Sequence, residues 1–164
     1  MKRNNTFVLG VLAAIFLLLP TGLWAQDHCS QDQREKRENC LLGSFSETVQ
    51  AFGMTFKALV TFSPGGGVVE TNNAQGQPVT VHGSWAVTKI DNQFALTFIT
   101  LGLNPPLVMQ GGLMAKTRET VNLSDSGDSF TAVFVSDFMD ANGNVFLTIS
   151  GTATGKRILV EPLN

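Results

Sequence analysis

The spacing of apolar residues after Gly43 constrains the fold of this chain more than any other feature of its sequence. From there onward, apolar side chains recur at every second position in short runs such as 54–62 and 94–98. This alternation places apolar side chains on one face of a β-strand and polar side chains on the other. Clusters of Gly, Asn, Asp and Pro, for example at 63–67 and 140–144, separate the runs and suit tight turns. The pattern therefore predicts an all-β domain.

Eight strands joined mostly by short links are expected. Such a succession favours pairing between neighbours in sequence, and closing the sheet removes its two exposed edges. We therefore predict an eight-stranded antiparallel up-and-down barrel, with an open sandwich as the alternative. The predicted strands cover 44–50, 54–63, 67–73, 80–89, 93–102, 109–123, 129–139 and 144–160.

Residues 1–25 have the three parts of a secretory signal peptide. Lys2 and Arg3 give a positive start, an apolar run covers 7–19, and the small residue Ala25 lies at the expected cleavage point. The alternative is a retained anchor, but the run has 13 residues, whereas a membrane-spanning helix needs roughly 20. We expect cleavage near Ala25 and a secreted or periplasmic product without stable membrane insertion.

The charge of the remaining chain excludes one class of partner. Residues 1–25 contain no acids, so removing Lys2 and Arg3 lowers Lys plus Arg from 11 to 9 against 13 Asp plus Glu, a formal charge of −4. Nucleic-acid affinity depends mainly on cations that neutralise phosphates. An acidic chain without clustered cations is therefore not expected to bind nucleic acid.

Residues 26–41 form a charged leader with two cysteines, ahead of a barrel domain at 42–164. The segment 30–38 is expected to be helical or irregular, and Cys29 and Cys40 lie on either side of it. Export favours a disulfide between them. A continuous helix would hold them roughly 16 Å apart, whereas a disulfide needs Cα atoms within about 7 Å. Either a short helix lets the chain fold back and the cysteines pair, which we prefer, or they do not pair internally.

Several motifs of the barrel domain together resemble those of a known group. Gly43-Ser44-Phe45 is similar to the Gly-x-Trp that opens lipocalins, with Phe in place of Trp. The stretch 42–163 resembles a group of uncharacterised secreted bacterial proteins with lipocalin-like (calycin-type) barrels. The resemblance implies a cup that holds a small apolar molecule, and it carries over no catalytic residue. The segments with this likeness are 61–66, 83–85, 127–130, 140–144 and 151–155.

Catalytic, metal and cofactor motifs are not apparent. His82 is the one histidine of the barrel domain, too few for a zinc site or a Ser/His/Asp triad. The glycines at 65–67 lack the Lys-Ser/Thr of a phosphate loop and are interpreted as a turn. The segment 140–144 has oxygen ligands at alternate positions but no later glutamate at calcium-loop spacing, so a hairpin turn is preferred. We expect no cofactor and no metal.

The phenylalanines leave two descriptions of the interior open. An eight-stranded barrel is just wide enough to be filled by its own side chains or to hold one small ligand. The chain has twelve Phe and no Tyr, which gives apolar volume without phenolic hydroxyls. If the barrel is hollow, the expected ligand contacts are Phe56, Trp85, Phe94, Phe98 and Phe134.

Glu119 is a weak candidate for a catalytic residue. It shares a predicted strand face with Thr117, Val121 and Leu123. If that face points inward, burial would raise the pKa of the carboxyl and fit it for acid/base work or ligand anchoring. A register shift would instead turn Arg118 inward. The preferred alternative is that this end of the strand lies at the rim with both charges solvated.

Three functions are therefore ranked. Binding of a small hydrophobic ligand in the barrel comes first. A non-catalytic structural or protein-interaction module with a filled barrel comes second, with 27–38 and the Pro105-Pro106 loop as contact surfaces. A cyclase- or isomerase-like enzyme acting on an apolar substrate through Glu119 comes third.

Overall fold

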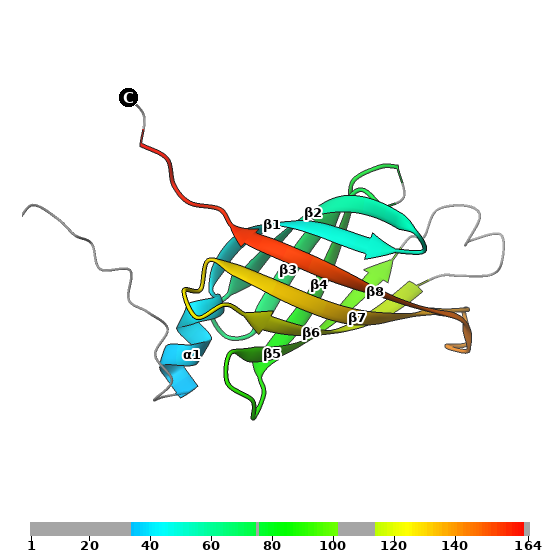
Figure 1. Ribbon diagram of the computed structural model, residues 1–164. Helices are drawn as coiled ribbons and strands as arrows, with labels where there is room; N and C mark the ends of the chain where they lie inside the picture. The colour runs from blue at the N-terminus through cyan, green and yellow to red at the C-terminus, as the bar shows by residue number, and fades with distance from the viewer. Residues whose placement is uncertain (1–33, 75, 102–113, 163–164) are drawn as a thin grey trace, which may run out of the picture.

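The computed structural model of the protein is a closed antiparallel barrel preceded by a short helix, and it describes residues 34–74, 76–101 and 114–162. The strands pair in the order of the sequence, and β8 returns to pair with β1 (Figure 1). The predicted eight-stranded up-and-down barrel is confirmed. Its elements are α1 (Arg34–Leu41), β1 (Gly43–Ala51), β2 (Met54–Ser63), β3 (Gly67–Asn72), β4 (Val79–Val87), β5 (Gln93–Leu101), β6 (Met114–Leu123), β7 (Ser129–Met139) and β8 (Val145–Arg157).

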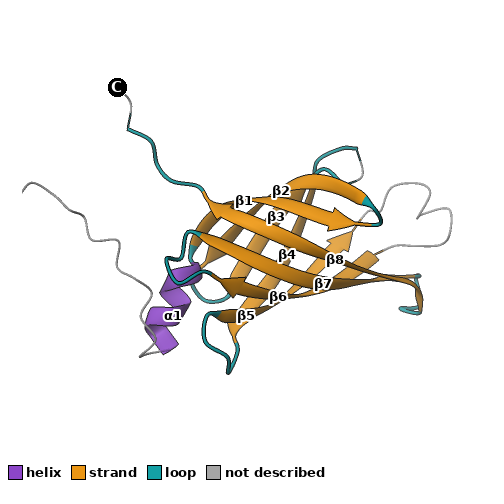
Figure 2. Cartoon of the chain, in the orientation of Figure 1, coloured by secondary structure: helices purple, strands orange, loops and turns teal. Residues whose placement is uncertain are grey.

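Two strands end more than one residue earlier than predicted, for local reasons. β4 ends at Val87 instead of 89, because the Thr88 hydroxyl accepts a hydrogen bond from the Ile90 N–H (3.1 Å) and starts the turn. β8 ends at Arg157 instead of 160, and Ile158 makes one more backbone bond, to Ser44, before the chain leaves the barrel (Figure 2). The start of the sixth predicted strand, 109–113, lies outside the described residues.

One half of the barrel is filled by aromatic side chains. Their rings meet edge to face, with centroids 5.2 Å apart for Phe45 and Phe130 and 5.9 Å apart for Trp85 and Phe94. The buried indole N–H of Trp85 donates to the Gly67 carbonyl (3.0 Å), as a buried indole must to avoid a desolvation cost. This filled half consists of Phe45, Phe62, Trp85, Phe94 and Phe130, covered by Leu41.

Arg157 and α1 close the end of the barrel next to the filled half. The guanidinium of Arg157 lies over the Phe45 ring, with Cζ 4.5 Å from the centroid. It donates to the carbonyls of Cys40 and Leu42 (both 2.6 Å) and of Gly127 (2.8 Å). One side chain of the last strand thus satisfies carbonyls at the end of α1 and in the link to β1.

The predicted leader is described in part. The described part of its helix is Arg34–Leu41, and Cys40 is disulfide-bonded. Cys29 and the predicted signal peptide, 1–25, lie outside the described residues, so the pairing of Cys29 with Cys40 stays a prediction. No helix among the described residues is long and apolar enough to cross a membrane.

Candidate ligand-binding site

The half of the barrel away from α1 is hollow. It contains a cavity of about 230 Å³, lined by inward-facing side chains of all eight strands. Both descriptions of the interior left open by the sequence therefore apply, each to one half of the barrel. The main apolar side chains of the wall are Val49, Phe56, Val81, Phe98, Phe134 and Ile149.

Two rings of the cavity wall lie against glycines of neighbouring strands. Phe98 pairs with Gly83, and Phe134 pairs with Gly151. A Cβ atom at Gly151 would lie 2.4 Å from Cζ of Phe134, and one at Gly83 would lie 2.1 Å from the Thr97 carbonyl oxygen and 3.0 Å from Cδ1 of Phe98. Contacts this short are forbidden, so each ring packs closely on backbone that only glycine provides.

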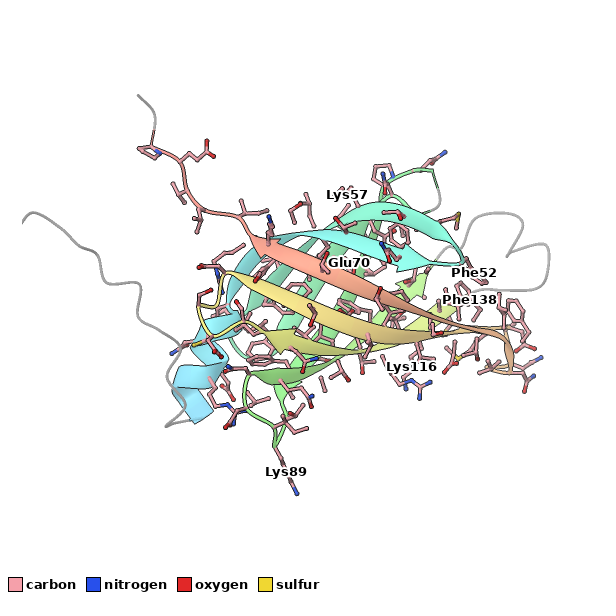
Figure 3. All side chains as sticks on the ribbon, in the orientation of Figure 1. Phe52, Lys57, Glu70, Lys89, Lys116 and Phe138 are labelled. Carbon is pink, nitrogen blue, oxygen red and sulfur yellow. The ribbon has the colours of Figure 1, made fainter. Side chains whose placement is uncertain are left out.

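Apolar side chains surround the mouth of the cavity. Phe52 and Met54, in and after the β1–β2 turn, line the cavity and are also 61% and 54% exposed, so the cavity reaches solvent there. Phe138 of β7 lines it as well, and Figure 3 shows Phe52 and Phe138 toward the end of the barrel opposite α1. An apolar molecule would meet this apolar rim first.

Phe52 has an unusual backbone for its side chain. It has φ 53° and is followed by Gly53 with φ 71°, so the two-residue turn between Ala51 and Met54 has positive φ at both central positions. Asn, Asp and Gly are the usual residues at the first position, and a bulky residue there costs roughly 1–2 kcal/mol. The backbone strain of this turn therefore lies at the rim of the cavity.

Three glutamates point into the barrel from three different strands. Glu119 of β6 and Glu70 of β3 line the cavity, and Figure 3 shows Glu70 toward the middle of the barrel. Glu47 of β1 lies one step deeper, because it follows Phe45 of the filled half and precedes Val49 of the cavity wall on the same strand face. Glu47 is 4% exposed and Glu119 is 9% exposed.

Burial changes the acidity of all three carboxyls in the same direction. It raises the pKa of Glu47 to about 9, and repulsion from Glu70 and Glu119 adds to the rise. Burial also raises the pKa of Glu119 to about 8, again with a contribution from Glu70. The pKa of Glu70 is raised by burial too, although a hydrogen bond from Asn72 opposes the rise. At neutral pH Glu47 and Glu119 therefore favour the neutral form.

Some polar groups of the cavity have hydrogen-bond partners and one does not. Asn72 donates to Glu70 Oε1 (2.8 Å), and the hydroxyls of Thr117 and Ser136 are 2.6 Å apart. Glu119 Oε1, in contrast, is buried and has no hydrogen-bond partner. A buried oxygen without a partner is costly and is a place where a ligand can supply a donor.

The structure separates the predicted contact residues into two groups. Phe56, Phe98 and Phe134 line the cavity, whereas Trp85 and Phe94 lie in the filled half and do not. The alternation alone identified which residues face inward but not how far along the barrel each lies.

The structure also shows in which direction the charged residues of β6 point. Glu119 faces inward, so the preferred alternative of a solvated rim carboxyl is wrong. Arg118 faces outward and forms an ion pair with Asp137 of β7, so it is no charge partner for Glu119. His82 is exposed on the outer face of β4.

Glu47 and Glu70 were missed from the sequence, although a signal was present. Each occupies an inward position of its strand, Glu47 between Phe45 and Val49, and Glu70 two residues after Val68. A glutamate in the apolar phase of an alternating pattern is the feature that would have identified them.

Metal binding finds no support in the described part of the chain. No group of three or more His, Cys, Asp or Glu there is arranged to hold a metal ion. The segment 140–144 is a hairpin turn in which Asp140 accepts hydrogen bonds from the backbone N–H groups of Asn142 (2.8 Å) and Asn144 (2.9 Å).

The comparisons with known proteins add no assignment to this geometry. No family model, no curated protein and no solved structure matches the chain.

Proposed function

We propose that this chain is an exported β-barrel protein that binds a small hydrophobic ligand in the hollow half of the barrel. The cavity of about 230 Å³, apolar in most of its wall and reaching solvent beside Phe52, carries the proposal. Ligand sites are typically concave and mostly apolar, with a few polar groups that fix orientation. The signal-peptide pattern of residues 1–25 supports export.

The size of the cavity bounds the ligand. If each non-hydrogen atom takes about the 30 Å³ of a water molecule in the liquid, the cavity holds roughly eight atoms. Toluene and 1-heptanol are of this size, and a long-chain fatty acid exceeds it. Small monocyclic or medium-chain molecules are therefore the proposed class.

Filling the cavity is expected to abolish binding without disturbing the fold. Ala115 lines the cavity, and Ala115→Phe would place a ring in the space that the ligand needs. We expect a 1:1 complex of the wild-type protein with toluene in calorimetry, and at least about a tenfold loss of affinity in the variant. Ala95→Phe, on the exposed outer face of β5, is the matched control and should bind as the wild type does. Equal affinities for the two variants would place binding outside the cavity.

The strained turn at the mouth gives a second prediction. Phe52→Asn should raise the free energy of unfolding by about 1 kcal/mol, because Asn tolerates the positive φ angle. It should also weaken toluene binding by about threefold, because apolar surface at the mouth is lost. Urea unfolding and calorimetry on the same sample measure both effects. Leu59→Asn, at an exposed site on β2 outside the cavity, should neither raise the free energy of unfolding nor weaken toluene binding. A Phe52→Asn protein that is less stable than the wild type would contradict this prediction.

The alternatives have weaker support. A solid barrel acting through its outer surface does not fit a cavity of this volume. An enzyme acting on an apolar substrate is favoured by one observation, the inward Glu119 with a pKa of about 8. Among the described residues it lacks a basic group beside Glu119, since Arg118 and His82 are both on the outer face.

A further inference from the structure

The three inward glutamates are not explained by binding of a purely apolar molecule. Among inward-facing residues of the described strands, the charged side chains are Glu47, Glu70, Glu119 and Arg157. Arg157 is engaged with three carbonyls and the Phe45 ring at the closed end. No cation of the described chain therefore neutralises the glutamates at the cavity.

A ligand that leaves these groups unpaired would bind less tightly than one that donates hydrogen bonds to them. An apolar molecule in the cavity would cover Glu119 Oε1, which already has no partner, without donating a hydrogen bond to it. A carboxylate ligand would place its negative charge beside Glu70 and Glu119 and would be repelled by either carboxyl when that carboxyl is ionised. The described residues are not arranged to hold a metal ion, so an organic cation is the remaining charge complement.

We propose that the cavity takes a small hydrophobic amine, whose apolar body packs against Phe56, Phe98 and Phe134 and whose ammonium group binds Glu119 and Glu70. This inference rests on the proposed function, because it names the ligand class of the same cavity. An ammonium group has three donors and no acceptor, so it suits a site whose polar groups are carboxyl oxygens. Glu47 lies just behind these two carboxyls, and burial together with repulsion from both raises its pKa to about 9.

Amine binding has a consequence that binding of a neutral ligand lacks. In the empty site the carboxyl of Glu119 is mostly neutral near pH 7, whereas an ammonium group favours an ionised carboxylate. The incoming amine keeps its proton, the carboxyl loses its proton to the buffer, and the complex forms an ion pair. We therefore expect release of about one proton per amine bound at pH 7.

Three ligands of equal chain length test the inference, namely heptylamine, 1-heptanol and heptanoate. Calorimetry of the mature protein at pH 7 should show that heptylamine binds about 10- to 100-fold more tightly than 1-heptanol, as expected for a charge-assisted hydrogen bond. Heptanoate should bind more weakly than 1-heptanol. Titration of heptylamine in buffers of different ionisation enthalpy should give the proton release.

Variants test whether the carboxyls cause the tighter binding of heptylamine. Glu119→Gln keeps the shape of the side chain and removes its charge, so it should weaken heptylamine binding by at least about tenfold and leave 1-heptanol within about twofold. Glu161→Gln makes the same substitution at an exposed position beyond β8 and should alter neither affinity. Since the proton release is measured on the wild-type protein, the test does not depend on the variant folding.

The possible results separate the inference from the proposed function. Equal binding of heptylamine and 1-heptanol, or tightest binding of heptanoate, would overturn the amine assignment and leave the cavity as a hydrophobic site. Amine binding without proton release, or unchanged in Glu119→Gln, would place the amine elsewhere and also overturn it. If neither toluene nor any of the three ligands binds, the proposed function fails together with the inference.

Discussion

The free energy of unfolding is expected to fall by at least about 3 kcal/mol when the pH is raised from 5 to 9. The pKa values of Glu47 (about 9) and Glu119 (about 8) are raised above the 4.5 of an unfolded chain, and that of Glu70 is raised as well. A raised pKa means that the folded state holds the proton more tightly than the unfolded state. The resulting stabilisation is complete below about pH 4.5 and is lost as the pH rises toward 8 and 9. Each such carboxyl contributes a slope of roughly 1.4 kcal/mol per pH unit.

Urea unfolding at pH 5, 7 and 9 measures how the free energy of unfolding changes with pH. Two variants test whether Glu47 and Glu119 cause the change. Glu47→Gln and Glu119→Gln should each reduce the slope and make the protein more stable than the wild type at pH 9, because an amide does not ionise. Glu161→Gln, exposed to solvent, should leave the slope unchanged. A stability that is flat or rises between pH 5 and 9 would mean that the glutamates are not buried as described.

Phe45→Ala is expected to destabilise the protein by about 3–5 kcal/mol, the usual cost of removing a fully buried phenylalanine. Phe45 is 0% exposed, packs edge to face on Phe62 and Phe130, and supports the guanidinium of Arg157. Its loss leaves a void that the closed end of the barrel cannot fill. Urea unfolding at pH 5, where Glu47 and Glu119 are neutral, separates this effect from that of their ionisation.

Phe56→Ala is the matched control for the division of the barrel into two halves. Phe56 is half-buried and borders a space that is already hollow, so its removal should cost clearly less than that of Phe45. It should instead alter ligand affinity, which Phe45→Ala should not do in the fraction that remains folded. Equal destabilisation by both variants would argue against separate filled and hollow halves.

Much of the barrel follows from the sequence because its determinants are local. The alternation in β2 and β5 assigned Phe62 and Phe94 to the interior, and the turn residues at 63–67 and 140–144 placed the hairpins. The ends of strands were less predictable. β8 ends where Arg157 turns toward carbonyls of residues 40 and 42, a contact across 115 or more positions of sequence that no local pattern contains.

The site was harder to predict than the fold because it depends on the distance of each residue from the closed end. Trp85 and Phe98 share the inward face of adjacent strands, yet the first fills the core and the second lines the cavity. That difference follows from the register between β4 and β5, which the separate strand patterns do not determine. Grouping Glu47, Glu70 and Glu119 requires the same information, since they come from three strands.

The closure of the barrel by its last strand has a consequence for how the chain acquires its fold. Residues 45–51 of β1 pair with 151–157 of β8, and Arg157 completes the cap over the first turns of the described chain. Until β8 has been synthesised, β1 and β7 are both free edges and the carbonyls at the end of α1 lack their donor. Contacts between the two ends of a chain form slowly because they close its longest loop. The barrel therefore cannot close until β8 is available, and we expect its folding to be completed late.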